Sequence, residues 1–123
     1  MASLIVLDGP QKDSYYPLGR RTTVIGRDEA LLIQILDERV SRKHLQIKYD
    51  KEKDKYRALD MSSKHGVLIN GNKIKDETPL VDGDCITIGT TMLWFTMKDF
   101  SDKESALSHY KKVGERSRPT FIE

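Results

Sequence analysis

The sequence predicts an all-β domain, folded as a sandwich or a barrel. Short runs of β-branched and aliphatic residues follow one another through the first 97 residues, and turn residues separate them at close intervals. The chain shows neither an alternation of strand and helix patterns nor an internal repeat. We expect strands over residues 4–7, 22–25, 44–50, 56–59, 67–69, 85–88 and 91–97.

The strand expected at 44–50 has the clearest pattern. Leu45, Ile47 and Tyr49 alternate with polar residues, which gives the strand one apolar and one polar face. The charged run at 50–55 follows directly. We expect it to form an exposed hairpin loop that leads into the next strand.

Turn residues mark the ends of other strands. Asp8-Gly9 ends the first apolar run, and Asn70-Gly71 is a strong hairpin signal because both residue types tolerate positive φ. The last run, 91–97, is apolar on both faces. That pattern is typical of a strand inside a sandwich.

After residue 100 the pattern changes to a helical period. Ser101 and Glu104 have the spacing of a capping box, and Ala106, Tyr110 and Val113 then recur at helical intervals. We expect a helix from about 102 to 113. The chain is therefore divided into a sandwich at 1–100, a helical segment packed on it at 101–114 and a flexible tail at 115–123.

Composition limits the class of protein. The 123 residues suffice for one domain with its own core. Lys plus Arg number 21 against 19 for Asp plus Glu, and this balance argues against nucleic-acid binding. The apolar stretches fall far short of the ~20 residues that a membrane span needs. A single cysteine, Cys85, suits a reducing compartment, so we expect a cytoplasmic protein. Because the domain is small and highly charged, we expect a monomer.

Polar and basic residues gather where expected strands end. One group is Ile25-Gly26-Arg27, a second runs from Arg39 to His44, and a third is at 63–66. Together they bring arginine, serine and lysine side chains to loops without a neighbouring general base or carboxylate. Fixed donors without a nucleophile suit an anion receptor, so the pattern indicates that a phosphate is bound rather than cleaved.

These residues resemble the forkhead-associated (FHA) domain family over roughly residues 4–97. The matching motifs are Gly26-Arg27, Ser41-x-x-His44 and Asp60-x-x-Ser63-x-x-Gly66-x-x-x-Asn70-Gly71. The resemblance implies an eleven-stranded β-sandwich whose loops at one end bind phosphothreonine peptides. It also implies that the protein is not an enzyme.

The resemblance assigns contacts to the phosphopeptide. Arg27 would donate to the phosphate, Ser41 would bind it through its hydroxyl and its backbone N–H, and Arg42 would add a second charge. Lys64 stands where the family usually has a threonine or a similar small polar residue. Arg39 stands where some relatives select the third residue after the phosphothreonine.

Other positions would support the site. His44 would brace the loops, Gly26 and Gly66 would shape them, and Asn70 would form the turn beyond them. One position departs from the family. His65 replaces the asparagine that grips the peptide main chain, so we expect a changed clamp, with either weaker binding or binding that depends on pH where histidine titrates.

The predicted function is therefore phosphothreonine-dependent protein interaction in Ser/Thr kinase signalling. The alternative is a phosphate-independent scaffold or regulatory subunit with the same fold, for which the change at His65 leaves room. An enzyme finds little support, because Ser41 lacks an evident base. His44, His65 and Cys85 show no metal-ligand spacing, so we expect no metal and no cofactor.

The C-terminal segment suggests a phosphorylation site. Thr120 follows Arg116 and Arg118, as a basophilic kinase prefers, and Glu123 is the third residue after it. A phosphorylated Thr120 could dock on the chain's own site or on that of a neighbour. The alternative is a flexible basic tail without such a role.

Overall fold

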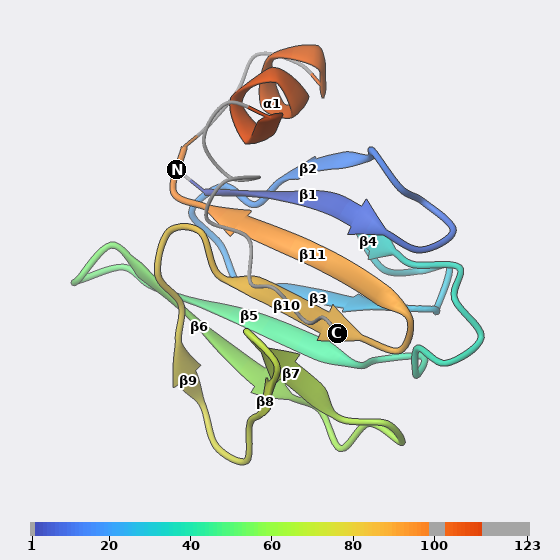
Figure 1. The fold of residues 1–123 in the computed structure, drawn as a ribbon. Coiled ribbons are helices and arrows are strands. Elements are labelled where there is room, and N and C mark those ends of the chain that lie inside the picture. Colours follow the sequence, from blue (N-terminus) through green and yellow to red (C-terminus); the bar gives the residue numbers. More distant parts are fainter. Residues whose placement is uncertain (1, 99–102, 112–123) are drawn as a thin grey trace.

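The computed structural model of the chain describes residues 2–98 and 103–111, in which it forms eleven strands and one helix. The strands form two sheets that pack against each other (Figure 1). The first sheet contains, in spatial order, β2 (Tyr15–Pro17), β1 (Ser3–Asp8), β11 (Thr91–Thr96), β10 (Cys85–Ile88), β7 (Val67–Ile69) and β8 (Asn72–Lys73). The second contains β4 (Ile33–Gln34), β3 (Thr23–Gly26), β5 (Leu45–Asp50), β6 (Lys55–Asp60) and β9 (Thr78–Pro79). The prediction of an all-β sandwich is confirmed.

Four strands were missed by the sequence pattern: β2, β4, β8 and β9. All four lie at the edges of the two sheets and contain only two or three residues. Edge strands are often this short, and a run of two or three residues is too short to show an alternation of apolar and polar residues.

The core between the sheets is built from alternating residues of the central strands. In β5, Leu45 and Ile47 are completely buried while Lys48 is exposed, as the alternation predicts. Tyr56 from β6 meets Phe95 from β11 edge to face, with ring centroids 5.7 Å apart. The two sheets are thus joined by large side chains that meet across the sandwich.

The helix α1 (Lys103–His109) covers the outer face of the first sheet (Figure 1). Ala106 and Tyr110 are buried there together with Ile5 and Trp94, and the rings of Trp94 and Tyr110 lie 5.1 Å apart. β11 is apolar on both faces because one faces the sandwich core and the other the helix. Residues 102 and 113, at which we expect the helix to begin and end, lie outside the described residues. The expected boundaries between the sandwich, the helical segment and the tail, at 100–101 and 114–115, also lie outside them.

Turn residues occupy the conformations that the sequence predicts. Asn70 has φ of 52° and Gly71 has φ of 84°, and Ile69 pairs with Asn72 across the resulting hairpin. The hairpin between β7 and β8 is therefore confirmed.

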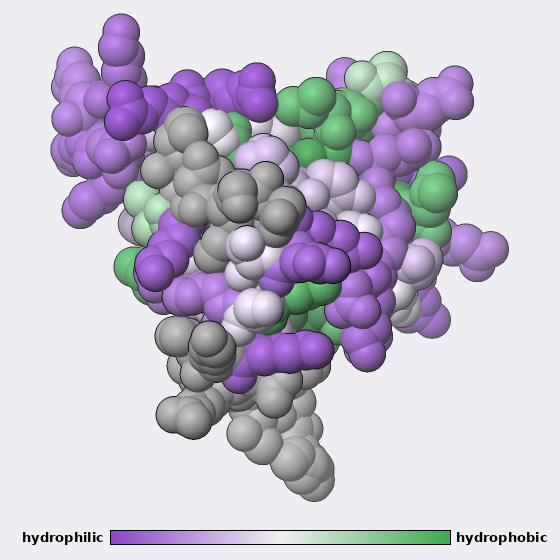
Figure 2. Space-filling model, turned by 90° about the horizontal axis from the view of Figure 1, so that it is seen from above, coloured by the Kyte–Doolittle hydropathy of each residue, from purple (hydrophilic) through white to green (hydrophobic). Residues whose placement is uncertain are grey.

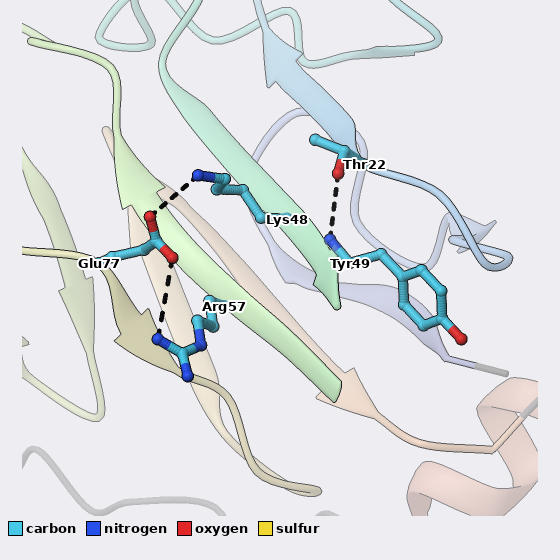
Figure 3. A network of polar contacts seen from close by, with 5 residues as sticks. All are labelled: Thr22, Lys48, Tyr49, Arg57 and Glu77. Carbon is cyan, nitrogen blue, oxygen red and sulfur yellow. Dashed lines mark hydrogen bonds and ion pairs between the residues drawn. The ribbon is translucent and has the colours of Figure 1, made fainter. Parts of the chain in front are cut away.

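The outer face of the second sheet carries a small polar network (Figure 3). Glu77 lies 3.1 Å from Lys48 Nζ and 3.9 Å from Arg57 Nη1, and the N–H of Tyr49 donates to Thr22 Oγ1 at 3.1 Å. Lys48 and Arg57 face each other on paired strands. Because these charges are partly solvated, they contribute little to stability.

Candidate functional site

Three loops meet at one end of the sandwich, on the right-hand side of Figure 1. They are the β3–β4 loop (residues 27–32), the β4–β5 loop (residues 35–44) and the β6–β7 loop (residues 61–66). Hydrogen bonds join the first to the second and the second to the third. The three groups of polar and basic residues noted in the sequence are therefore brought together.

Gly26 allows the first two loops to approach closely. At the end of β3, the N–H of Arg27 donates to the Ser41 carbonyl at 3.0 Å, and the N–H of Asp28 donates to the Arg42 carbonyl at 3.2 Å. A Cβ atom at position 26 would lie 2.1 Å from the Arg42 carbonyl oxygen. A side chain cannot fit there, so this position requires glycine.

Arg27 is held by the neighbouring loop. Its Nε donates to the carbonyl of Val40 at 3.0 Å, and its side chain is otherwise exposed. A guanidinium has five N–H donors in a planar fork, so one bond orients the group without exhausting it. Arg27 therefore presents a fixed charge at the rim of the β4–β5 loop.

Ser41 connects the second loop to the third. It is half-buried, and its Oγ accepts the backbone N–H of Lys64 at 3.1 Å. A hydroxyl that accepts one hydrogen bond can still donate its own proton. The Ser41 hydroxyl thus remains capable of binding an anion beside Arg27.

His44 links Ser41 to Gly66 from inside the fold. Its ring is completely buried, Nδ1 accepts the Ser41 backbone N–H at 3.0 Å, and Nε2 lies 2.7 Å from the Gly66 carbonyl oxygen. These partners assign a neutral ring with its proton on Nε2. In this structure the Ser41 N–H thus donates to His44, and its expected contact with a phosphate stays a prediction.

The β6–β7 loop is shaped by its own side chains. The Ser63 N–H donates to Asp60 Oδ1 at 2.9 Å, and Ser63 Oγ accepts the Gly66 N–H at 3.0 Å. Gly66 has φ of 80°, a conformation that favours glycine. These bonds fix the turn that carries Lys64 and His65.

Asn70 lies away from the loop cluster, at the other end of β7. Its Nδ2 donates to Asp84 Oδ1 and its Oδ1 accepts the Cys85 N–H, both at 2.9 Å. It therefore anchors the β7–β8 hairpin to β10. The other three expected supports, Gly26, His44 and Gly66, lie within the cluster.

Asp37 is a buried residue of the cluster that the sequence analysis missed. Its Oδ1 accepts the Arg39 N–H at 2.9 Å, while Oδ2 accepts the N–H and hydroxyl of Thr90 at 2.8 and 2.7 Å and the Thr91 hydroxyl at 2.9 Å. Burial acts to raise the pKa of this carboxyl, but hydrogen bonds from Thr90, Arg39 and Thr91 outweigh it and hold the pKa below its usual value. Asp37 thereby fastens the β4–β5 loop to the β10–β11 turn.

Basic side chains surround this framework. The exposed ones are Arg27, Arg39, Arg42, Lys43, Lys64 and His65. The ion pairs found between residues 2 and 98 and within 103–111 include none of these side chains. Arginine and lysine side chains outside these ion pairs thus stand around fixed donors, an arrangement that suits an anion, while Asp28, Glu29, Asp37 and Glu38 lie on the same loops.

The described part of the chain contains neither a metal-ligand cluster nor a membrane-spanning helix. Within these residues, no three His, Cys, Asp or Glu side chains are grouped as metal ligands would be. In the same residues, no helix has the length and apolar character needed to cross a membrane.

Thr120, the expected phosphorylation site, lies outside the described residues.

The sequence profile of the FHA domain matches residues 23–89, a segment that includes all three loops. The chain belongs to the FHA domain family. The resemblance inferred from the motifs is thus confirmed, and the FHA segment contains Arg27, Ser41 and Lys64.

Two known proteins are similar in sequence to most of this chain. The oxoglutarate dehydrogenase inhibitor of Corynebacterium jeikeium is 34% identical over 76% of this chain and 63% of its own length. The glycogen accumulation regulator GarA of Mycolicibacterium smegmatis is 32% identical over 82% of this chain and 62% of its own length. This chain thus spans less than two thirds of either relative.

A solved structure has the same fold as this chain. It comes from a structural and functional analysis of phosphothreonine-dependent FHA domain interactions and is 28% identical to this chain. It superposes with a TM-score of 0.70, over 80% of this chain and 98% of the solved one.

Proposed function

We propose that this protein binds a phosphothreonine-containing segment of a partner protein and acts in Ser/Thr kinase signalling. The observation that supports this most strongly is the joining of three loops around Arg27 and the Ser41 hydroxyl. Arg27 is oriented by the Val40 carbonyl, and Ser41 by the Lys64 N–H. The donors are fixed before any ligand arrives, which lowers the entropy cost of binding.

The chemistry of phosphothreonine matches these donors. The phosphate carries about −1.5 to −2 charges at neutral pH and has three acceptor oxygens. The guanidinium fork of Arg27 can donate to two of them, and the Ser41 hydroxyl to one. Charge-assisted hydrogen bonds of this kind are worth roughly 1.5–3 kcal/mol each. Arg42 and Lys64 add positive charge at the rim.

The placement of His44 supports binding without catalysis at Ser41. Both ring nitrogens are engaged, with the Ser41 N–H and with the Gly66 carbonyl, and the ring is buried. A general base must reach the proton that it removes. His44 contacts the backbone of Ser41 rather than its hydroxyl, so it does not activate that hydroxyl as a nucleophile.

Two exposed residues would read the peptide around the phosphothreonine. Arg39 follows the anchored Asp37 and would pair with a carboxylate at the third position after the phosphothreonine. His65 would contact the peptide main chain in place of the family's asparagine. The FHA relative from the study of phosphothreonine-dependent interactions supports this class of ligand.

A peptide-binding titration tests the proposal. Wild type, Arg27→Ala and Arg57→Ala are titrated with a phosphothreonine peptide library, with phosphoserine and unphosphorylated peptides as controls. Arg57 is a matched control because it is a partly exposed arginine on the outer face of β6. We expect wild type and Arg57→Ala to bind phosphothreonine peptides equally, and Arg27→Ala to lose at least tenfold in affinity.

The same titration distinguishes a second candidate function, a phosphate-independent scaffold or regulatory subunit with the same fold. The replacement of the family's asparagine by His65 is the observation that favours it, because that change alters the contact to the peptide main chain. Equal binding of phosphorylated and unphosphorylated peptides, unaffected by Arg27→Ala, would support the scaffold function and reject ours.

A further inference from the structure

Two exposed leucines lie on either side of β4. Leu32 is 68% exposed and Leu36 is 60% exposed. Among the described residues, Val81 is the one other large hydrophobic side chain exposed to this degree, at 62%. Seen from above the helix, hydrophobic side chains form small separate patches among hydrophilic ones (Figure 2). Because so few large hydrophobic side chains of the described residues are exposed, Leu32 and Leu36 are a local feature rather than part of a wide apolar face.

The backbone of β4 holds these leucines outward. β4 pairs in parallel with β3, and Ile33 and Ile35 point into the core, where they are 2% and 0% exposed. Exposure alternates along residues 32–36, so Leu32, Gln34 and Leu36 lie on the side opposite to Ile33 and Ile35. We call these three residues the β4 strip.

The free edge of β4 is closed by a side chain from the β1–β2 turn. The Leu36 N–H donates to Gln11 Oε1 at 2.6 Å, and Gln11 Nε2 donates to the Gln34 carbonyl at 2.8 Å. Gln11 Nε2 also donates to the Tyr16 hydroxyl at 2.8 Å. Gln11 thus takes the two backbone bonds that an added strand would need, which leaves side-chain contact as the way to bind at the β4 strip.

The β4 strip borders the phosphate-binding loops. Gln34 Nε2 donates to the Arg27 carbonyl at 3.1 Å, so the middle residue of the strip contacts the main phosphate donor. Leu36 immediately precedes Asp37, which anchors the β4–β5 loop. The β4 strip therefore lies next to the loop residues to which the proposed function assigns the phosphate.

We propose that the β4 strip binds apolar side chains of the same partner segment that carries the phosphothreonine. This inference rests on the proposed function and adds a specificity determinant to it. Two leucines bury far less than the ~800 Å² per partner of a stable protein interface, so they do not support dimerisation alone. They suffice as a second contact for a ligand already held by its phosphate, where the effective concentration is high.

The test uses the full chain and synthetic phosphothreonine peptides. The parent peptide has serine at the four positions on each side of the phosphothreonine, and eight further peptides carry one leucine each. Affinity is measured for wild type, Leu32→Ser, Leu36→Ser and the control Val81→Ser. Val81 is equally exposed but lies before the start of β10. The β4–β5 loop contacts the residues that follow the opposite end of β10, so Val81 is away from the loops.

We expect leucine at one or two positions to tighten binding to wild type and to Val81→Ser by about tenfold. That is the size expected when roughly two thirds of a leucine side chain leaves water. At least one of Leu32→Ser and Leu36→Ser should lose this gain while binding the all-serine peptide as wild type does. Because both leucines are exposed, these variants should fold normally.

Two results would overturn the inference, and they differ in what they mean for the proposed function. If wild type binds the all-serine phosphothreonine peptide but leucine at no position improves affinity, or if both leucine variants keep the gain, the β4 strip has no such role and the proposed function stands. If wild type binds none of the nine peptides and also fails to bind a phosphothreonine peptide with glutamate at the third position after it, the proposed function fails and this inference fails with it.

Discussion

Replacing Asp37 by asparagine tests whether this buried carboxylate holds the β4–β5 loop in place. The asparagine side chain would keep the shape but lose the charge, and its NH2 group would face at least one donor from Arg39, Thr90 or Thr91. Hydrogen bonds to a charged group are worth about 1.5–3 kcal/mol, and a buried unsatisfied donor costs about 1–3 kcal/mol. We expect the free energy of unfolding at pH 7 to fall by about 2–4 kcal/mol.

The pH dependence of this loss provides the sharper test. The folded-state pKa of Asp37 is held below its usual value, so the carboxylate stabilises the fold fully above the unfolded-state pKa of about 3.9. That contribution is lost as pH falls through the lower folded-state pKa. The difference between wild type and Asp37→Asn should therefore be constant from pH 7 to about 5 and shrink below about 4.

Urea unfolding at pH values from 7 to 3 measures both quantities. Asp76→Asn serves as the control, because Asp76 is exposed and lies before β9; it should change the free energy by less than about 0.5 kcal/mol. A loss below about 0.5 kcal/mol for Asp37→Asn at pH 7, or a difference that does not shrink in acid, would refute the role assigned to Asp37.

Three further changes have definite expected effects. Gly26→Ala places a Cβ atom 2.1 Å from the Arg42 carbonyl and should lower the free energy of unfolding by about 2 kcal/mol or more; a neutral result in urea would contradict the close approach. His44→Ala leaves a loop N–H and a loop carbonyl without their partner, so thermal and urea unfolding should reveal a loss of about 2–4 kcal/mol, and a loss below about 1 kcal/mol would argue against the brace. Glu77→Gln should cost less than about 1 kcal/mol at low salt and less still in 1 M salt; a larger, salt-independent loss would show that this network matters more than its exposure indicates.

The central strands could be predicted because their own residues carry the signal. In β5 the alternation is clear from Leu45 to Lys48, and Asn70-Gly71 has the turn chemistry that the β7–β8 hairpin requires. The edge strands could not be predicted in this way. β4 owes its place to pairing with β3 and to Gln11, a residue 25 positions from Leu36, and neither contact leaves a local pattern.

In the candidate site, too, local features could be predicted from the sequence and long-range contacts could not. The order and spacing of Arg27, Ser41 and His44 identified the loops, since these motifs are local. The sequence did not reveal which atoms meet: His44 takes the Ser41 N–H, and Asp37 binds Thr90, 53 residues away. Such long-range bonds depend on how the loops are arranged in space, which spacing along the chain does not specify.

The most direct test of the phosphothreonine-binding proposal is an NMR titration of the ¹⁵N-labelled full chain with a phosphothreonine peptide. We expect amide shifts concentrated at residues 27, 39–42 and 64–65, saturating with the peptide and absent when the unphosphorylated peptide is added. Shifts confined to another face of the sandwich, or the same shifts with the unphosphorylated peptide, would contradict the proposal.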